Sequence, residues 1–177
     1  MTAVCVAGAT GWTGRPIAEA ILASDDLTLG GAVSRSAAGR DLGEAWGGAP
    51  IGVVACASVD EALDGVDVLV EYTSTETVKA NTLTAIAHGV HVVIGSSGLS
   101  AEDFAEIDDA ARAAGVGVIA AGNFSITAAM AQAAALLVAP YLPHREIIDY
   151  ASYSKPDSPS GTSRELAERL ATVAPNE

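Results

Sequence analysis

The chain has 177 residues, half of them hydrophobic, which is enough to bury a core as one domain or as one domain and part of a second. Nine Lys and Arg residues stand against 22 Asp and Glu residues, giving a formal net charge of -13. Because a net negative charge of this size repels polyanions, we do not expect nucleic acid or membrane surfaces as partners. We therefore expect any anionic ligand to be held by a few local groups.

The sequence indicates neither a targeting segment nor a membrane span. The N-terminal apolar run TAVCVAGATG is too short for a signal peptide, and no apolar run is long enough to cross a bilayer. Cys5 and Cys56 lie in apolar stretches without metal-ligand spacing, so we expect both to be buried free thiols in a reducing compartment. These features predict a cytoplasmic protein without a metal site.

Strand and helix patterns alternate over the first two thirds of the chain. Short apolar runs predict strands at 3–7, 27–34, 51–55, 66–72, 90–94 and 117–121. Helical periodicity and capping residues predict helices at 16–23, 58–63, 75–88 and 100–114. The segment 36–50 reads as a loop with room for a short helix. This alternation is typical of an α/β fold with a Rossmann-type doubly wound parallel sheet.

The pattern changes after Asn123. Helices predicted at 127–139 and 163–172 flank one longer predicted strand at 146–154. A single strand leaves two unprotected edges, so this part reads as the start of a second α+β substrate domain. We expect a dinucleotide-binding Rossmann domain over residues 1–122 and a partial substrate-binding and oligomerisation domain over 123–177.

A glycine-rich loop joins the first predicted strand to the first predicted helix. It reads Gly8-Ala9-Thr10-Gly11-Trp12-Thr13-Gly14-Arg15. The GxxGxxG spacing is a variant of the dinucleotide fingerprint, in which glycines allow a tight turn and let the backbone approach a pyrophosphate at the helix N-terminus. A purely structural turn is the alternative, but the position between strand and helix favours a nucleotide. Arg15 either contacts the phosphates or is a solvated helix residue.

The end of the second predicted strand indicates which nucleotide binds. NAD sites usually carry an acidic residue there, whereas this chain has Ser34-Arg35-Ser36. An arginine and two hydroxyls suit the 2′-phosphate of NADP, which a carboxylate would repel. We therefore predict NADPH as the cofactor. If Arg35 only stacks on adenine, NADH is also accepted.

A second anion site is indicated near the C-terminus, where residues 152–166 read SYSKPDSPSGTSREL. This segment combines the cation of Lys155 with the turn Ser160-Gly161-Thr162 at the start of a predicted helix. Backbone amides at a helix N-terminus, together with a cation, suit a carboxylate or phosphate. The alternative is a plain turn in which Ser160 or Thr162 caps the helix without meeting a ligand.

Five segments together resemble one family in order and spacing. They are Gly8 to Arg15, Glu71-Tyr72-Thr73, Val93 to Gly98, Gly122 to Ser125 and Lys155 to Thr162. The family is 4-hydroxy-tetrahydrodipicolinate reductase, also called dihydrodipicolinate reductase, and the resemblance covers essentially the whole chain. It implies an NAD(P)H-dependent oxidoreductase of lysine (diaminopimelate) biosynthesis that reduces a cyclic imine dicarboxylate. Two alternatives stay open: a reductase of another carboxylated cyclic imine, and a non-catalytic NADPH-binding homologue.

The resemblance also implies roles for individual residues. Residues implied to bind the cofactor are Gly8, Ala9, Thr10, Gly11, Trp12, Thr13, Arg35, Gly95, Ser96, Ser97, Ala121, Gly122, Asn123 and Phe124. Those implied to hold the substrate's carboxylates are Lys155, Ser160, Gly161 and Thr162. The family position of Ser34 is commonly acidic and that of Arg35 commonly basic, which again favours NADPH.

The expected proton donor departs from the family pattern. The family carries a His-His pair just before the lysine motif, and this chain has Ala151 and Ser152 there. Its three histidines, His88, His91 and His144, lie elsewhere and read as surface or helix-end residues. If residues 146–155 form a strand, Tyr153 and Lys155 share one face, so we predict these two residues as the candidate catalytic groups.

The second departure is length. Family members continue past the last helix with strands that complete the sheet of the substrate domain, whereas this sequence ends at Glu177. We expect a truncated form or fragment, and the alternative is a partner chain that supplies the strands. A homo-oligomer is expected if the substrate domain is completed.

Overall fold

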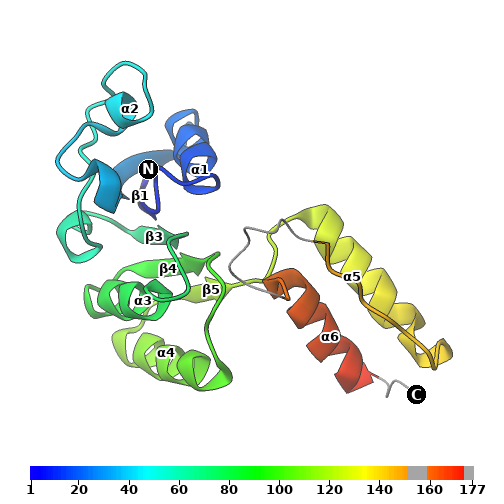
Figure 1. Cartoon of the computed structure of the whole chain (residues 1–177). Helices are drawn as coiled ribbons and strands as arrows, with labels where there is room; N and C mark the ends of the chain where they lie inside the picture. Colours follow the sequence, from blue (N-terminus) through cyan, green and yellow to red (C-terminus); the bar gives the residue numbers. More distant parts are fainter. Residues whose placement is uncertain (151–158, 174–177) are drawn as a thin grey trace. The chain divides into compact units, whose positions relative to one another are not determined.

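The computed structural model describes residues 1–150 and 159–173. Contacts within the chain group it into two compact units, Met1–Ala120 (unit 1) and Ala121–Glu177 (unit 2). Figure 1 shows both units coloured along the sequence.

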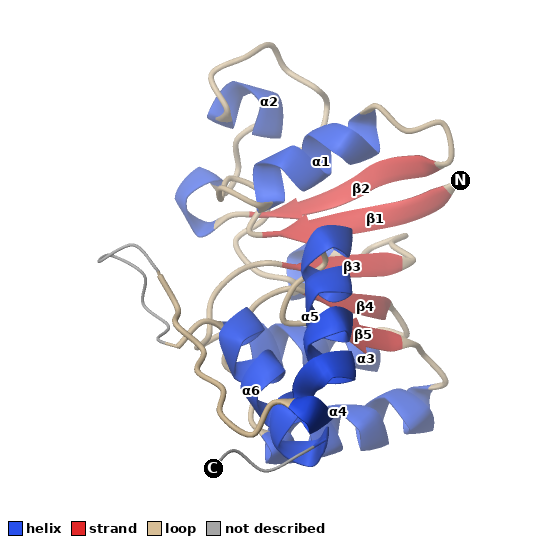
Figure 2. Ribbon diagram, turned by 90° about the vertical axis from the view of Figure 1, so that its right-hand side faces the viewer, coloured by secondary structure: helices blue, strands red, loops and turns tan. Residues whose placement is uncertain are grey.

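Unit 1 is built around a parallel sheet of five strands in the order β2-β1-β3-β4-β5 (Figure 2). The strands are β1 (Thr2–Ala7), β2 (Leu27–Val33), β3 (Val68–Glu71), β4 (His91–Ile94) and β5 (Val118–Ala120). From β1 the chain runs outward to β2 and then returns past β1 to β3. This reversal is the switch point of an open parallel sheet, and it confirms the predicted Rossmann-type topology.

Helices cover both faces of the sheet. On one face α1 (Gly14–Leu22) buries Ile21 in a cluster with Val6 of β1. On the other, α3 (Val78–Ala87) and α4 (Ala101–Ala114) bury Ile86 and Ile107 in a cluster with Ala7. Because successive side chains of a strand point to opposite faces, β1 is buried on both sides, which explains its unbroken apolar run.

The ends of α4 follow the signals expected from the sequence. The Ser100 hydroxyl accepts a hydrogen bond from the Asp103 amide at 3.1 Å, and the Asp103 carboxylate accepts one from the Ser100 amide at 2.9 Å. This capping box satisfies two amides that the helix itself leaves unpaired. Lys79 of α3 lies 2.7 Å from Asp103 and, with the Ser100 groups, lowers the pKa of Asp103 to about 2. Gly115 ends the helix with φ of 70°.

The predicted strand at 51–55 is wrong, because only isolated bridges form around this segment. The side chain of Asp41 accounts for the difference. Its carboxylate accepts hydrogen bonds from the amides of Ile51 at 3.0 Å and Gly52 at 2.8 Å. These amides therefore cannot donate to a neighbouring strand. Gly52 also has φ of 81°, which interrupts the extended backbone.

The neighbouring short helices also differ from the sequence pattern. The predicted helix at 58–63 is only the 3-10 turn η2 (Asp60–Ala62), since so short a segment cannot offset the cost of nucleating an α-helix. The predicted loop at 36–50 holds two short helices, η1 (Arg35–Ala37) and α2 (Leu42–Ala45).

Unit 2 contains α5 (Ile126–Val138), the 3-10 turn η3 (Ala139–Tyr141) and α6 (Gly161–Val173). Both α-helices were predicted, with boundaries shifted by one or two residues. The predicted strand at 146–154 is wrong over residues 146–150, which form no strand, and its remaining residues lie outside the described ranges. A strand needs a neighbour for its backbone groups, and the described part of unit 2 provides none.

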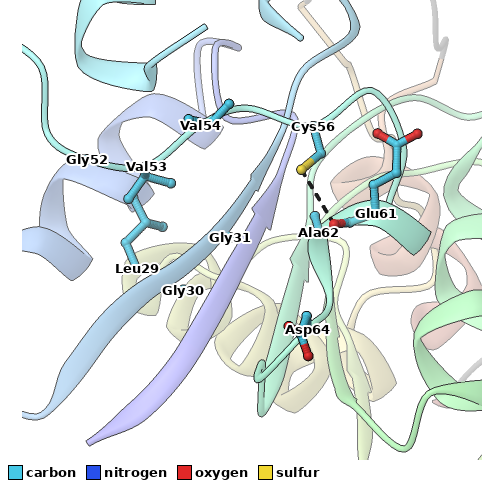
Figure 3. Close-up of a pocket in the computed structure, with 10 residues that line it drawn as sticks. All are labelled: Leu29, Gly30, Gly31, Gly52, Val53, Val54, Cys56, Glu61, Ala62 and Asp64. Atoms are coloured by element: carbon cyan, nitrogen blue, oxygen red, sulfur yellow. Dashed lines mark hydrogen bonds between the residues drawn. The ribbon is translucent and has the colours of Figure 1, made fainter. Parts of the chain in front are cut away.

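The two cysteines differ in exposure. Cys5 is fully buried in β1, and burial raises the pKa of its thiol to about 12. Cys56 is half-buried and lines a pocket of about 260 Å³ beside β2, together with the acidic residues Glu61 and Asp64 (Figure 3). Burial, and then the charge of Glu61, raise the pKa of Cys56. The expectation of two buried thiols is therefore confirmed for Cys5 and wrong for Cys56.

We predict that iodoacetamide modifies Cys56 and spares Cys5 in the folded chain. At about pH 8, a thiol with a pKa of about 12 is ionised in roughly one molecule in ten thousand, and Cys5 is also inaccessible. The Cys56 rate should rise as the pH is raised, because the thiolate is the reactive form. Peptide mapping by mass spectrometry reads out each site, with concentrated urea as the positive control for Cys5. Equal labelling of both thiols in the folded chain would contradict this assignment.

Among residues 1–150 and 159–173, no helix combines the length and apolar character that a membrane span requires. The same residues contain no cluster of three or more His, Cys, Asp and Glu side chains that could hold a metal ion.

Candidate nucleotide and substrate site

The strands of unit 1 end level with one another at the carboxyl edge of the sheet. Their pairing places side by side the last residues Val33, Ala7, Glu71, Ile94 and Ala120. The predicted cofactor segments Gly8 to Thr13 and Gly95 to Ser97 begin directly after Ala7 and Ile94, and Arg35 follows Val33 by two positions. The register therefore brings those segments to one edge, where open α/β sheets bind their ligands.

The glycine loop is packed so closely that two of its positions have no room for a side chain. A Cβ atom on Gly8 would lie 2.2 Å from the carbonyl oxygen of Tyr72, and one on Gly14 would lie 2.1 Å from the carbonyl oxygen of Gly8. Gly8 also has φ of 83°. The amide of Gly11 closes the turn by donating to the Gly8 carbonyl at 2.8 Å. The loop thus has the tight turn that the GxxGxxG pattern predicts.

The far side of this loop presents backbone amides at the start of α1. Within the described ranges, the amides of Trp12 and Thr13 meet no acceptor, and the Thr13 side chain makes no capping hydrogen bond. Unpaired amides and the helix dipole together favour an anion at this point. The side chain of Trp12 is 99% exposed, so it is accessible to a ligand bound on the loop.

The segment after β2 joins the glycine loop through hydroxyl groups. The Ser34 hydroxyl is buried, 2.7 Å from the Thr10 hydroxyl and 3.3 Å from that of Ser36. Arg35 is exposed. A hydrogen bond from Ser74 lowers the pKa of Glu76, and the positive charge of Arg35 lowers it further. The Arg35 guanidinium, after β2, therefore interacts electrostatically with a carboxylate that follows β3. The arrangement offers hydroxyls and one cation, and no acidic side chain at the end of β2.

One residue that holds the glycine loop, Trp46, was not identified from the sequence. The indole of Trp46 donates to the Ala9 carbonyl at 3.1 Å, and the guanidinium of Arg15 lies 5.5 Å from the centre of the Trp46 ring. Arg15 also pairs with Glu19 at 2.8 Å, as expected of a helix surface residue. Trp46 lies in the Gly- and Ala-rich segment 36–50, where no sequence periodicity predicts a contact with a residue 37 positions away.

The segment after β3 is fixed by a fully buried carboxylate. Glu71 accepts hydrogen bonds from the Thr73 amide at 3.2 Å, the Thr73 hydroxyl, and the Asn81 amide group at 3.1 Å. Its second oxygen, Oε2, is buried without a partner in the described part of the chain. Beside it, the ring of Tyr72 covers Gly95, where a Cβ atom would lie 1.9 Å from a ring carbon. Glu71 thus positions the turn between β3 and α3 at the edge of the site.

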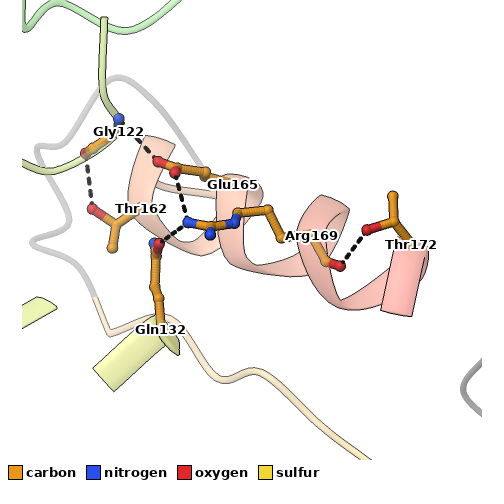
Figure 4. A network of polar contacts seen from close by, with 6 residues as sticks. All are labelled: Gly122, Gln132, Thr162, Glu165, Arg169 and Thr172. Atoms are coloured by element: carbon orange, nitrogen blue, oxygen red, sulfur yellow. Dashed lines mark hydrogen bonds and ion pairs between the residues drawn. The ribbon is translucent and has the colours of Figure 1, made fainter. Parts of the chain in front are cut away.

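In unit 2 the structure brings the segment Ala121 to Phe124 against the Ser160-Gly161-Thr162 turn (Figure 4). The Thr162 hydroxyl donates to the Gly122 carbonyl at 3.0 Å and accepts from the Asn123 side chain at 3.1 Å. A Cβ atom on Gly122 would lie 2.9 Å from the Gly161 carbonyl oxygen. A segment predicted to bind the cofactor and a turn predicted to bind the substrate are therefore in direct contact.

Ser160 serves as the cap of α6. Its hydroxyl accepts a hydrogen bond from the Ser163 amide at 3.3 Å, as the alternative sequence interpretation expected. Its own amide donates to the Asp149 carboxylate at 2.7 Å, so this turn binds a carboxylate of the chain itself. A helix N-terminus that binds one carboxylate has the chemistry to bind another.

The predicted catalytic residues Tyr153 and Lys155, and the neighbouring Ala151 and Ser152, lie outside the described residues. Two histidines are engaged away from the carboxyl edge of the sheet: His88 contacts Asp60 at 2.9 Å, and His91 at the start of β4 accepts the Gly117 amide at 2.8 Å.

Comparison with known proteins identifies relatives over the whole chain. A family model described as dihydrodipicolinate reductase, N-terminus, matches residues 2–124. The chain is 37% identical to a 4-hydroxy-tetrahydrodipicolinate reductase of Thermosynechococcus vestitus, over 96% of this chain and 64% of that protein. It is 36% identical to one of Desulfitobacterium hafniense, over 96% of this chain and 65% of that protein. The chain thus spans about 65% of the length of these curated relatives.

Solved structures show the same similarity. The dipicolinate-bound dihydrodipicolinate reductase of Paenisporosarcina sp. TG-14 superposes with a TM-score of 0.77 at 26% identity, covering 100% of this chain and 68% of that one. A biliverdin reductase of Synechocystis, bound to biliverdin and NADP+, has a TM-score of 0.52 at 17% identity and shares the fold alone.

Proposed function

Since this chain belongs to the dihydrodipicolinate reductase family, we propose that it binds NADPH and reduces a cyclic imine dicarboxylate. The reaction corresponds to the one that names the 4-hydroxy-tetrahydrodipicolinate reductases of lysine (diaminopimelate) biosynthesis. The observation that carries the proposal is the closed glycine loop at the switch point of the sheet, with the amides of Trp12 and Thr13 exposed at the start of α1.

The residues at the edge of the sheet fit a dinucleotide. A pyrophosphate suits the loop Gly8 to Thr13, because its backbone can approach closely and its amides carry partial positive charge. A 2′-phosphate suits Arg35 and the hydroxyls of Ser34 and Ser36. Gly95 to Ser97 and the segment Ala121 to Phe124 are the proposed contacts of the nicotinamide end. When bound, the reduced nicotinamide supplies a hydride.

The substrate's carboxylates are the proposed ligands of Lys155 and the Ser160-Gly161-Thr162 turn. A cation and backbone amides hold two carboxylates in a fixed orientation, which places the conjugated imine for hydride transfer. As the hydride arrives at the conjugated imine, electron density develops on nitrogen or carbon, and a proton must be supplied there. With Ala151 and Ser152 at the family's histidine positions, Tyr153 and Lys155 are the proposed donors of that proton.

The proposal is tested by following NADPH absorbance with freshly generated 4-hydroxy-tetrahydrodipicolinate. We expect oxidation of NADPH that depends on both the chain and the substrate. NADPH binding without any oxidation would instead identify a non-catalytic NADPH-binding homologue. Oxidation with a different carboxylated cyclic imine, but not with this one, would identify the third candidate.

We predict that Ser34→Asp lowers NADPH affinity by about 30-fold or more and affects NADH less. A carboxylate a few ångströms from the 2′-phosphate costs about 2–4 kcal/mol at an effective dielectric constant near 20. Tryptophan fluorescence titration with each nucleotide measures the NADPH to NADH ratio. Ser34→Ala is the matched control, since it removes the Thr10 contact without adding charge. A ratio that is the same in both variants would contradict the assigned 2′-phosphate position.

A further inference from the structure

The backbone of Gly122 is held on both sides by the first turns of α6. Its carbonyl accepts from the Thr162 hydroxyl at 3.0 Å, and its amide donates to Oε2 of Glu165 at 3.0 Å. Figure 4 shows these two contacts reaching the same peptide segment from adjacent positions on the helix. Gly122 is exposed, so its backbone is held in place by these two hydrogen bonds and not by burial in a core.

The packing at this point leaves no room for a side chain on residue 122. A Cβ atom on residue 122 would lie 2.5 Å from Glu165 Oε2 and 2.9 Å from the Gly161 carbonyl oxygen. The backbone of the segment therefore lies directly on the start of α6, at a distance that only glycine permits.

Glu165 is itself held by a chain of contacts that ends on α5. Its other oxygen, Oε1, lies 3.5 Å from Arg169, and Arg169 donates to the side chain of Gln132 at 3.0 Å. Gln132 is the buried residue of α5. A carboxylate supported in this way has a restricted set of rotamers, so it fixes the Gly122 amide more firmly than a solvated side chain would.

We infer that Glu165 is a positioning residue, which locks the cofactor-facing segment Ala121 to Phe124 to the substrate-binding turn of α6. The inference rests on the proposed function, because it takes both segments in their proposed roles. Because Glu165 and Thr162 hold opposite sides of Gly122, a substrate carboxylate that orders the start of α6 also orders the segment beside the nicotinamide. The two ligands should then bind cooperatively, with the coupling carried by Glu165.

The test is a double titration of the 177-residue chain with NADPH and dipicolinate, a planar dicarboxylate that does not react. We expect dipicolinate to raise NADPH affinity about fivefold or more, which is the lower end of typical coupling between sites. In Glu165→Ala the ratio should fall to near one, while each ligand alone binds within about threefold of the original chain. Glu165→Gln keeps an oxygen for the Gly122 amide and should retain the ratio.

Glu168→Ala is the matched control, since Glu168 is exposed on the same helix and carries the same charge. Circular dichroism melts of all variants verify that unit 2 stays folded. An unchanged ratio in Glu165→Ala, or a ratio of one in the original chain, would overturn the inference and leave the proposed function standing. A chain that binds neither ligand would overturn the proposed function, and the inference with it.

Discussion

Replacing Gly14 by alanine is expected to lower NADPH affinity by about two orders of magnitude or more. The new Cβ atom would lie 2.1 Å from the Gly8 carbonyl oxygen and 2.7 Å from its carbon, so the backbone of the loop must move apart. That movement displaces the amides of Trp12 and Thr13 from the phosphates. Each lost hydrogen bond to a charged group costs about 1.5–3 kcal/mol, and two such losses give the expected effect.

Gly48→Ala is the control for this variant. A Cβ atom there would lie 3.5 Å from the Gly43 carbonyl oxygen, which is an ordinary contact, so nucleotide affinity should be unchanged. Fluorescence titration with NADPH gives the affinity, and thermal unfolding of both variants separates loss of binding from loss of folding. A folded Gly14→Ala variant with unaltered NADPH affinity would show that the pyrophosphate does not bind on this loop.

Replacing Lys155 by methionine is expected to lower kcat/KM for the imine by about 100-fold or more. Removing the cation of a charge pair leaves the substrate carboxylate without its partner, which costs about 2–5 kcal/mol. Methionine keeps the length of the side chain, so the effect reports on charge. NADPH affinity should not change, because the proposed cofactor contacts do not include Lys155.

Lys79→Met is the matched control, because Lys79 is the other lysine of the sequence and pairs with Asp103 and Glu106 on the surface of unit 1. It should leave kcat/KM unchanged. The measurements are initial rates over a range of imine concentrations, followed by NADPH absorbance. Retention of kcat/KM in Lys155→Met would remove Lys155 from both of its proposed roles, carboxylate ligand and proton donor.

The parts of the fold that were predictable depend on local patterns. Strand β1 reads as an apolar run because both of its faces are buried, and the loop Gly8 to Gly14 follows a spacing set by backbone geometry. The capping box of α4 likewise depends on two residues three positions apart, Ser100 and Asp103. Such features need no knowledge of distant parts of the chain.

The parts that were not predictable depend on partners far away in sequence. The segment 51–55 has strand composition, but Asp41 takes its amides. Residues 146–150 have strand composition, but no neighbouring strand is present in the described part of unit 2. Trp46 contacts the glycine loop and Glu165 contacts Gly122, each through a single hydrogen bond, across 37 and 43 residues, and no periodicity marks such contacts.

The interlocked glycines have a consequence for the thermodynamics of binding. Since Gly8 lies against the Tyr72 carbonyl and Gly14 against the Gly8 carbonyl, the loop has little freedom to adopt another shape before a ligand arrives. The conformational entropy of this segment is thus lost when the chain folds, and a phosphate group meets a preorganised surface. Nucleotide affinity should therefore depend on the folded stability of unit 1, so substitutions that loosen β1 or α1 should weaken binding without touching the ligand.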